Sequence, residues 1–534
     1  MKVNNNIIDK IISLKLNTLN DLKQKKSLRD LIDEVKNIQQ NQFQTNISFT
    51  QKIKAKSRGK NSITNNTFFI LECKQASPSQ GMINNNFDLQ NIINTYANFA
   101  DAISVLCEEN YFKGSVQNLQ QVKQILNQKN IFDIPLLCKD FIIDEYQIYM
   151  AKLYGANAIL LMLNVLDNDE YIYLSNVAKS LNLDVLTEIS DEQEATFAIQ
   201  CKAENIGINN RDFTTLKTNL KRTNLLVDFI IKNINTNASN ENYQPNLISE
   251  SGFSNHSEIV EYSNIVDGFL IGTSLMKQHN SLDIACQKLL LGEIKICGIT
   301  NADDAKFLDN FNTYNKNIFM LYAGLIFVET SKRFVSIEIA KNIVQQTKNL
   351  QYVAVFQNEQ NIEKIILLLQ KLDIKNIKII QLHGDENFEN IEYIQNLKSK
   401  LLNTFGENIA NEIQIWKAVS ASKVNSKNNL ENLVENYLQN DISKIILDNQ
   451  NGGSGKTFDW NLIPEKYKQN IMLSGGINLN NLQEALNIGC AGIDISSGVE
   501  LQNNNNNINN IVKKDTQKIQ QLFKNFFNLH NYKK

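Results

Sequence analysis

Residues 134–163 read IPLLCKDFIIDEYQIYMAKLYGANAILLML, and this stretch contains the pattern that decides the fold. The runs Ile134–Cys138 and Ala158–Leu163 are short and apolar without strict alternation, which is typical of strands buried on both faces of a parallel sheet. Between them, Asp144–Tyr154 spaces its apolar residues as an amphipathic helix does. The stretch therefore predicts a strand–helix–strand unit with parallel strands.

Apolar runs of the same kind recur through the first half of the chain. They are Phe68–Cys73, Ala102–Cys107, Ile134–Cys138, Ala158–Leu163, Asp184–Ile189, Asn205–Asn209, Asn246–Glu250 and Gly268–Gly272. Helical spacing returns between them, for example at Glu192–Cys201. Eight strand–helix units favour a closed (β/α)8 barrel over an open sheet.

The second half repeats this count. Its predicted strands are Ile294–Cys297, Gly324–Val328, Tyr352–Phe356, Lys378–Leu382, Ile413–Ala418, Lys444–Leu447, Ile471–Leu473 and Gly492–Ile495. Phe68 to Thr273 spans 206 residues and Ile294 to Gly498 spans 205. The sequence therefore predicts an α/β protein of two tandem (β/α)8 TIM barrels rather than three unrelated domains.

The predicted boundary lies near Leu291, where the helical stretch Leu282–Leu291 runs almost directly into the next strand. We expect the domains to cover residues 1–291 and 292–534. Residues 1–60 precede the first strand and are predicted to be a charged helical extension packed on the first barrel. Residues 503–510 form an Asn-rich loop to which no function is assigned.

The composition of the 534 residues excludes several classes of protein. The net charge of −2 carries no basic excess, so we expect no nucleic-acid partner. Seven scattered cysteines and four histidines predict neither a disulfide framework nor a metal site. No signal peptide is expected, and the longest apolar run falls far short of the ~20 residues that span a membrane. We expect a soluble cytoplasmic monomer.

Glycine and serine stand at the predicted ends of strands seven and eight in both barrels. These turns are Ser249–Gly252 and Gly272–Ser274 in the first barrel, and Ser474–Gly476 and Ser496–Gly498 in the second. TIM barrels build their phosphate sites after these two strands, where glycines let backbone N–H groups approach the anion. One such turn is weak evidence, but matched pairs predict that each barrel binds a phosphorylated small molecule.

Charged and amide side chains mark the other strand ends of the first barrel. They are Glu72, Lys74, Lys139, Glu188, Asn209, Arg211 and Glu250. Each alone reads as a solvated charge at the end of a strand. Because the carboxyl ends of barrel strands converge on one mouth, their recurrence there predicts acid–base chemistry on an anionic substrate.

These motifs resemble the indole-3-glycerol-phosphate synthase family over roughly residues 1–290. The resemblance is carried by Ile70–Gly81, Leu137–Phe141, Leu186–Glu188, Gly207–Asp212 and Ile248–Gly252. It implies ring closure of carboxyphenylamino-deoxyribulose phosphate, with loss of CO₂ and water, to indole-3-glycerol phosphate. Gln75 and Thr273 depart from the residues usual at these positions.

The resemblance also implies a role for each residue of this first site. Lys139 is the general acid that protonates the ketone oxygen, Glu188 acts as acid and base in the dehydration, and Lys74 holds the substrate carboxylate or shares the acid role. Glu72, Asn209 and Glu250 orient these groups. The substrate-binding residues are Ser77, Arg211, Ser251, Gly252, Gly272 and Thr273.

The second half resembles the phosphoribosylanthranilate isomerase family across residues 293–534. The motifs are Lys295–Thr300, Gly324–Arg333, Gln381–Gly384, Leu447–Trp460 and Asp494–Gly498. The resemblance implies an Amadori rearrangement that supplies the substrate of the first barrel.

Within this second site, Asp448 would be the acid that opens the furanose ring, and Cys297 would be the base that removes the C2 proton. Arg333 would bind the anthranilate carboxylate, and Gly475, Gly476 and Ser496 the phosphate. Taken alone, Cys297 reads as a buried small hydrophobe and Arg333 as a loop surface charge. A thiolate base needs its pKa held near the working pH, and Lys295 or nearby backbone N–H groups are expected to assist.

The leading hypothesis is thus a bifunctional enzyme of tryptophan biosynthesis. It needs no cofactor, since neither half carries a nicotinamide fingerprint or a metal cluster. One alternative is an active barrel fused to a degenerate barrel that only binds a phosphosugar or buttresses its partner. Another is histidine-pathway isomerisation, but that chemistry relies on paired aspartates, which the Cys297–Asp448 pair fits poorly.

Overall fold

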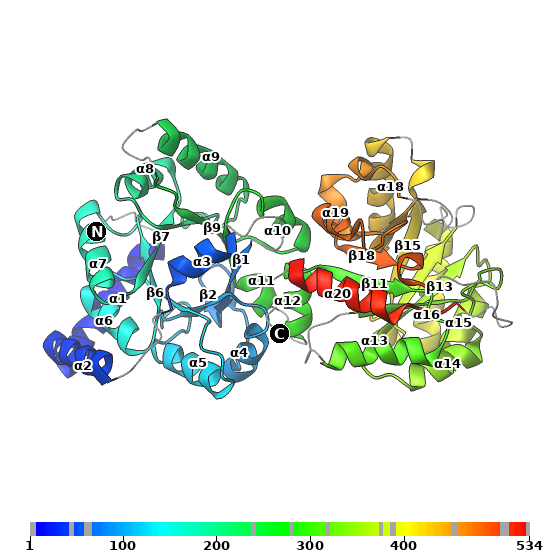
Figure 1. Cartoon of the computed structure of the whole chain (residues 1–534), viewed down its shortest axis with the longest axis horizontal. Coiled ribbons are helices and arrows are strands. Elements are labelled where there is room, and N and C mark those ends of the chain that lie inside the picture. The colour runs from blue at the N-terminus through cyan, green and yellow to red at the C-terminus, as the bar shows by residue number, and fades with distance from the viewer. Residues whose placement is uncertain are drawn as a thin grey trace. The chain divides into compact units, whose positions relative to one another are not determined.

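The computed structural model describes residues 7–41, 47–57, 67–236, 242–277, 281–314, 321–372, 377–384, 391–424, 426–449, 457–501 and 512–529. The chain forms two compact units that part between Ala285 and Cys286, with the segment Asn255–Glu261 grouped with the second unit. Each unit is built around one barrel of parallel strands ringed by helices (Figure 1).

The first barrel closes in the order β1-β10-β9-β8-β7-β6-β5-β4. Its strands are β1 (Phe68–Cys73), β4 (Ala102–Leu106), β5 (Leu136–Lys139), β6 (Ala158–Met162), β7 (Asp184–Ile189), β8 (Asn205–Asn209), β9 (Asn246–Glu250) and β10 (Gly268–Ile271). A hairpin of β2 (Ala76–Ser77) and β3 (Gly81–Met82) follows β1 and was not predicted. Every strand pair of the barrel is parallel, so all carboxyl ends meet at one mouth.

Helices cover the outside of this barrel. They are α4 (Leu89–Tyr96), α5 (Gln117–Gln128), α6 (Glu145–Leu153), α7 (Asn168–Ser180), α8 (Glu192–Gln200), α9 (Lys221–Thr236), α10 (His256–Tyr262), α11 (Thr273–Met276) and α12 (Leu282–Leu290). Side-chain caps fix where several of them begin. Asp144 accepts a hydrogen bond from the Tyr146 N–H at the start of α6, and Asp167 and Glu170 form a capping box on α7.

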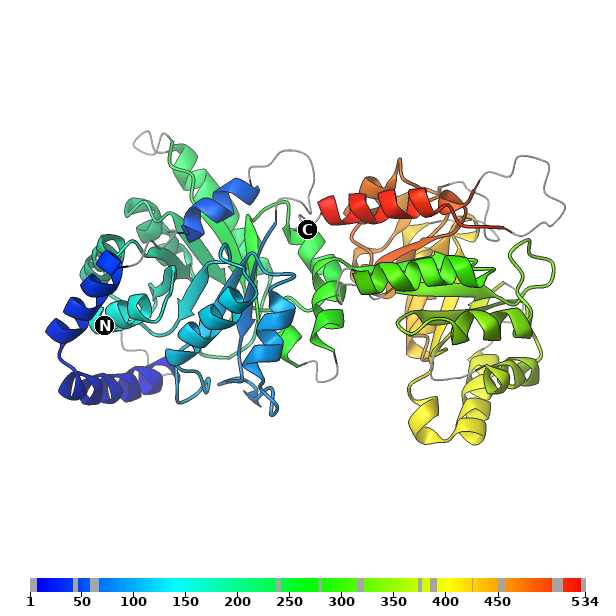
Figure 2. The same ribbon diagram turned by 60° about the horizontal axis from the view of Figure 1, so that its bottom comes forward.

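The predicted N-terminal extension consists of α1 (Ile7–Lys25), α2 (Leu28–Asn41) and α3 (Phe49–Ser57). Figure 2 shows these blue helices lying against the first barrel. Leu19, Leu31 and Tyr146 pack into one buried cluster that joins α1 and α2 to α6. The prediction that the extension packs on this barrel is confirmed.

Helix α3 lies at the amino ends of the strands. The Phe49 ring packs edge-on against Phe68, at the start of β1. The N–H of Thr50 donates to Asp184 at 3.0 Å, and its hydroxyl accepts from Asn205 at 2.7 Å. The opposite end of the barrel, formed by the carboxyl ends of the strands, carries the cavity described below.

The second barrel closes in the simple order β11 to β18. Its strands are β11 (Glu293–Cys297), β12 (Leu321–Ile326), β13 (Gln351–Gln357), β14 (Ile379–His383), β15 (Gln414–Ser420), β16 (Lys444–Asp448), β17 (Ile471–Leu473) and β18 (Gly492–Ile495). Its α-helices are α13 (Ala302–Tyr314), α14 (Ile337–Gln345), α15 (Ile362–Lys371), α16 (Ile391–Phe405), α17 (Glu407–Ala410), α18 (Lys427–Gln439), α19 (Leu482–Asn487) and α20 (Thr516–Leu529). Short 3-10 helices are η2 (Ala421–Lys423), η3 (Trp460–Leu462), η4 (Glu465–Asn470) and η5 (Ser497–Val499).

The predicted fold class is confirmed, and each predicted strand overlaps a strand of one barrel. Strand β5 starts two residues later than predicted, because Pro135 has no N–H to donate to a neighbouring strand. Strand β12 is shifted toward the N-terminus, from Gly324–Val328 to Leu321–Ile326. The Asn-rich stretch at 503–510 lies outside the described residues. Within the described part of the chain, no helix is both long and apolar enough to cross a membrane.

Candidate active sites

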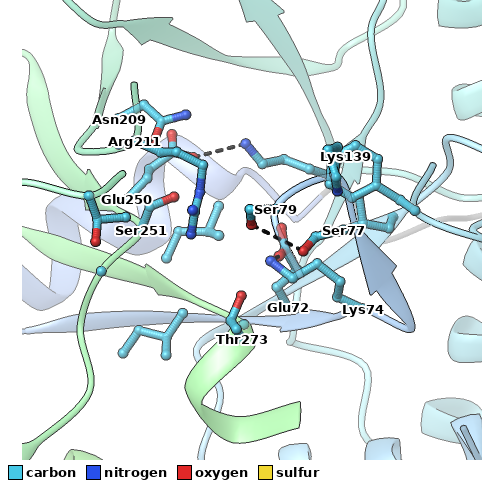
Figure 3. Close-up of a pocket in the computed structure, with 18 of the residues that line it drawn as sticks. Glu72, Lys74, Ser77, Ser79, Lys139, Asn209, Arg211, Glu250, Ser251 and Thr273 are labelled. Atoms are coloured by element: carbon cyan, nitrogen blue, oxygen red, sulfur yellow. Dashed lines mark hydrogen bonds and ion pairs between the residues drawn. The ribbon is translucent and has the colours of Figure 1, made fainter. Parts of the chain in front are cut away.

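All predicted site residues of the first barrel line one cavity of about 410 Å³ at the carboxyl ends of its strands. They are Glu72, Lys74, Ser77, Lys139, Glu188, Asn209, Arg211, Glu250, Ser251, Gly252, Gly272 and Thr273. Figure 3 shows the labelled side chains around a common space, although they come from strands far apart in the sequence. The convergence predicted from the strand ends is therefore confirmed.

Lys139 occupies the centre of the charged cluster in this cavity. Its Nζ lies 2.9 Å from Glu188 Oε2 and 2.9 Å from Glu250 Oε2. Burial alone would lower the pKa of this ammonium, but the two carboxylates outweigh burial and raise the pKa above its ordinary value. Lys139 therefore carries its proton throughout the neutral range.

Glu250 is held by the same contact, but a raised pKa favours the neutral form of a carboxyl, whereas it favours the charged form of a lysine. Burial and the neighbouring charge of Glu188 raise the pKa of its carboxyl to about 7, while Lys139 acts to lower it. On the other side, Asn209 Nδ2 donates to Glu188 Oε1 at 3.1 Å, so both oxygens of Glu188 have a partner. The cavity thus holds an ammonium and two oriented carboxyl groups within one hydrogen-bonded unit.

Lys74 and Arg211 are the other predicted cations of the cavity, which Lys277 also lines. Lys74 Nζ lies 2.7 Å from Glu72 Oε1, and the Lys74 side chain remains 12% exposed. Arg211 is held by its own loop, since its Nη1 donates to Leu216 O at 2.7 Å and its N–H donates to Asn209 Oδ1 at 2.9 Å. Both cations are therefore positioned to meet an anionic group that enters the cavity.

The six predicted site residues of the second barrel also line one cavity, of about 120 Å³. They are Cys297, Arg333, Asp448, Gly475, Gly476 and Ser496. Cys297 ends β11 and Asp448 ends β16, which lie on opposite parts of the barrel wall. The glycines follow β17 and Ser496 follows β18, as predicted for an anion-binding turn.

The pKa of the Cys297 thiol is set by burial and by the charges of nearby residues. Burial raises the pKa of the thiol, and the charge of Asp494 adds to this rise. Lys295 lowers the pKa, but its Nζ is engaged by Asp494 Oδ2 at 2.7 Å and does not overcome burial. Lys295 therefore assists in the predicted direction, but burial of the strand end keeps the pKa of the thiol above its ordinary value.

Comparison with known proteins matches the two halves of the chain to two enzyme families. Residues 8–288 match indole-3-glycerol phosphate synthase, and residues 294–525 match N-(5'phosphoribosyl)anthranilate isomerase. The tryptophan biosynthesis protein TrpCF of Buchnera aphidicola subsp. Schizaphis graminum is 39% identical over 477 residues, which cover 89% of this chain and 94% of that protein. TrpCF of Vibrio parahaemolyticus is 41% identical over 457 residues, covering 86% and 84%.

The chain belongs to the TrpCF family of tryptophan biosynthesis proteins. It is a bifunctional enzyme with an N-terminal indole-3-glycerol-phosphate synthase barrel and a C-terminal phosphoribosylanthranilate isomerase barrel. Both matches agree with the family resemblances found in the sequence.

The synthase cavity contains aromatic residues that the sequence did not single out. Phe112 and Phe141 both line it, with ring centroids 6.2 Å apart. The loop that carries Phe112 folds around the buried carboxylate of Glu108, which accepts hydrogen bonds from the N–H groups of Asn110, Tyr111 and Phe112. An apolar wall therefore faces the charged cluster, a combination suited to a substrate that is both aromatic and anionic.

The isomerase site contains two charged residues that the sequence also did not predict. Arg333 Nε and Nη2 donate to the two carboxylate oxygens of Glu500 at 2.6 Å and 3.0 Å, and Lys514 Nζ donates to Glu500 Oε1 at 3.0 Å. Glu500 could have been suspected, because it follows the Asp494–Gly498 motif directly. Lys514 gave no signal, since the Asn-rich stretch separates it from every recognised motif.

Among the described residues, no group of three His, Cys, Asp or Glu side chains is placed to hold a metal ion.

Proposed function

We propose that Lys139 is the general acid of the synthase reaction and protonates the ketone oxygen of carboxyphenylamino-deoxyribulose phosphate as the aromatic carbon attacks. The observation that carries this proposal is the contact of one ammonium with Glu188 and Glu250, at 2.9 Å each, inside the cavity. Because these carboxylates raise its pKa, Lys139 is charged at neutral pH and has a proton to give.

Glu188 then serves as acid and base in the dehydration step. Its position supports this role, because it touches the general acid directly and is oriented by Asn209. Glu72 and Glu250 complete the cluster as orienting groups. Their negative charges also favour the positively charged, iminium-like intermediate that loss of CO₂ and water passes through.

The remaining residues of the synthase cavity bind the substrate. Lys74 holds the carboxylate that leaves as CO₂ or shares the acid role, and Arg211 provides a second cation. The phosphate is bound at the turns after β9 and β10, whose residues are Ser251, Gly252, Gly272 and Thr273, with Ser77 on the β2 hairpin. The Phe112 and Phe141 side chains line the cavity beside the aromatic ring.

In the isomerase barrel, Asp448 is the acid that opens the furanose ring of phosphoribosylanthranilate, and Cys297 is the base that removes the C2 proton. Their arrival at one cavity from β16 and β11 supports this pair. Arg333 binds the anthranilate carboxylate, since a planar fork suits a carboxylate better than a lysine does. Gly475, Gly476 and Ser496 bind the phosphate.

We also propose domains of residues 1–291 and 292–534, because α12 ends at Leu290 and β11 begins at Glu293. The whole chain is proposed to act as a cytoplasmic monomer on phosphorylated small molecules, without nucleic acid. The net charge of −2 supports the last point. The cysteines support a reducing compartment, because no disulfide joins them.

Separate expression of residues 1–291 and 292–534 tests the assignment of one reaction to each half. We expect the first piece to form indole-3-glycerol phosphate and the second to isomerise phosphoribosylanthranilate. A folded second piece that binds the substrate without converting it would instead indicate a degenerate barrel. Circular dichroism of each piece distinguishes an inactive fold from an unfolded chain.

A further inference from the structure

Glu500 and Lys514 form a buried charge network beside the isomerase cavity. Glu500 accepts two hydrogen bonds from one edge of the Arg333 guanidinium, in the bidentate geometry that fixes an arginine most firmly. Lys514 donates to the same carboxylate and to the backbone carbonyl of Ser496 at 3.2 Å. Its side chain is 0% exposed. One lysine therefore links the arginine to the turn after β18.

The backbone around this network is also paired. Glu500 and Lys514 form an isolated antiparallel bridge, and the N–H of Lys514 donates to Asp304 Oδ2 at 2.9 Å. The Asp515 N–H donates to Val499 O at 2.8 Å. Lys514 thus enters the network from a segment that is anchored independently of the cavity.

The network connects the three residues to which we assign carboxylate binding, phosphate binding and the base role in the isomerase site. Arg333, Ser496 and Cys297 line the cavity, whereas Glu500 and Lys514 do not. Ser496 Oγ donates to the Cys297 carbonyl at 3.1 Å, so the turn held by Lys514 is bonded to the strand end that carries the thiol. The Arg333 side chain passes over Gly298, where an added Cβ would lie 2.5 Å from Arg333 Cδ.

We propose that Glu500 and Lys514 are positioning residues of the isomerase site. Glu500 fixes the Arg333 guanidinium where it meets the substrate carboxylate, and Lys514 joins this pair to the phosphate-binding turn at Ser496 and to the Cys297 base. The inference rests on the roles proposed above for Arg333, Ser496 and Cys297. It adds two residues that act through these groups and do not touch the substrate.

A charge count explains why Lys514 accompanies Glu500. Arg333 and Glu500 alone form a neutral pair, which offers little attraction to an anionic substrate. Adding Lys514 leaves one net positive charge among the three buried groups, where electrostatic attraction is stronger than in water. Lys332, 3.8 Å from Glu500, is 64% exposed, so solvent screens its charge. The Nη1 group of Arg333 is not used by Glu500 and can donate to the substrate carboxylate.

The same ammonium acts on the base. Burial raises the pKa of the Cys297 thiol, and Lys514 is one of two lysines whose charge lowers it, the other being Lys295. Lys295 is already paired with Asp494 at 2.7 Å. Lys514 is the cation that also connects to Arg333, so its charge couples substrate binding to formation of the thiolate.

Steady-state isomerase kinetics of the full chain test each residue by a different parameter. For Glu500→Gln we expect KM for phosphoribosylanthranilate to rise about tenfold with a smaller change in kcat, because loss of the anchor that orients Arg333 outweighs the gain in net positive charge. For Lys514→Gln, which keeps a hydrogen-bond donor but removes the charge, we expect the acid limb of the kcat/KM profile to move up by about one pH unit. Lys514→Arg, which keeps the positive charge, should leave the acid limb of the kcat/KM profile at its wild-type pH.

Lys444→Met provides the matched control. Lys444 pairs with Glu293 in the same barrel, has a side chain only 11% exposed, and does not line the cavity. The Lys444→Met substitution should lower the stability of the second barrel without changing KM or the pH profile of kcat/KM. An unchanged KM in Glu500→Gln overturns the role of Glu500, and an unmoved acid limb in folded Lys514→Gln overturns that of Lys514. If Lys514→Gln does not fold, Lys514→Arg gives the test instead. An acid limb of the kcat/KM profile that shifts in Lys514→Arg, although the positive charge is kept, overturns the role of the charge.

The synthase activity of each variant chain reports whether the first barrel is intact. Absence of isomerase activity in the unsubstituted chain would instead contradict the proposed function. The two failures are therefore distinguishable, because the first appears only in the variants and the second appears before any substitution is made.

Discussion

Lys139 Nζ lies 2.9 Å from Glu188 Oε2, a contact between residues 49 positions apart that joins the ends of β5 and β7 across the mouth of the synthase barrel. The two groups assigned the first proton transfer and the later dehydration are thus in direct contact. Because this contact keeps Lys139 protonated, one arrangement can serve both steps without a bound metal or cofactor.

Replacing Lys139 by alanine should lower formation of indole-3-glycerol phosphate by a factor of about 10² to 10⁴, the range typical for loss of a general acid. The isomerase rate of the same chain should not change, since Lys139 lies in the other barrel. Separate assays of each step, each started from its own substrate, check both statements. Loss of both activities in a folded variant would contradict two independent sites.

Replacing Cys297 by alanine should have the reverse effect. Without the thiol, nothing in the proposed scheme removes the C2 proton, so isomerisation should stop while indole-3-glycerol phosphate still forms from added carboxyphenylamino-deoxyribulose phosphate. Cys297→Ser is the sharper comparison, because it keeps the shape but not the acidity of the thiol. Full isomerase activity in either variant would show that Cys297 is only a buried hydrophobe.

Gly475→Ala should damage the isomerase site by a steric route. An added Cβ would lie 2.6 Å from Asp448 Oδ1 and 2.8 Å from the Asn449 nitrogen, and the residue has a φ of +82°. We expect kcat to fall by at least about tenfold, because a displacement of the acid by even 1 Å is costly. Gly406→Ala is the control: its φ is +78°, but no atom lies within 4 Å of the added Cβ. Equal isomerase losses in both would reject the steric explanation.

The stability of the second barrel should depend on pH through Glu500. Burial by itself would raise the pKa of this carboxyl, but the hydrogen bond from Arg333 and the charge of Lys514 outweigh it and hold the pKa at about 2, against an ordinary 4.5. Because the folded pKa lies below the unfolded one, the stabilisation is present above pH 4.5 and is lost as the pH falls toward 2. The difference in stability between wild type and Glu500→Gln should therefore shrink over this interval.

Tryptophan fluorescence measures this difference for the second barrel alone, because both tryptophans of the chain, Trp416 and Trp460, are buried there. Urea titrations at several pH values give the unfolding midpoints. A difference that grows toward acid pH would mean that Glu500 is not held ionised by Arg333 and Lys514.

The strands and the synthase site could be predicted because each depends on local sequence. Runs such as Ala158–Met162 are apolar throughout and are buried along their whole length. Lys139 and Glu188 stand at strand ends, and barrel closure brings all strand ends together. No knowledge of side-chain contacts was needed for that conclusion.

The isomerase electrostatics could not be predicted in the same way. Whether Lys295 would lower the pKa of Cys297 enough depended on Asp494. This residue lies 199 positions away in the sequence, and its carboxylate accepts a hydrogen bond from the Lys295 ammonium. Lys514 reaches Glu500 from beyond the Asn-rich stretch, so no spacing rule connects them. Contacts between distant segments decide the charge balance of a buried site, and these contacts follow from the closed barrel rather than from any short motif.

The most direct test of two separate and complementary sites is a mixing experiment. The full-length variants Lys139→Ala and Cys297→Ala are each supplied with phosphoribosylanthranilate, first alone and then together. Each alone should form no indole-3-glycerol phosphate, whereas the mixture should form it, because the intermediate made by one chain is consumed by the other. A mixture that remains inactive, although each variant keeps its own remaining activity, would contradict the account.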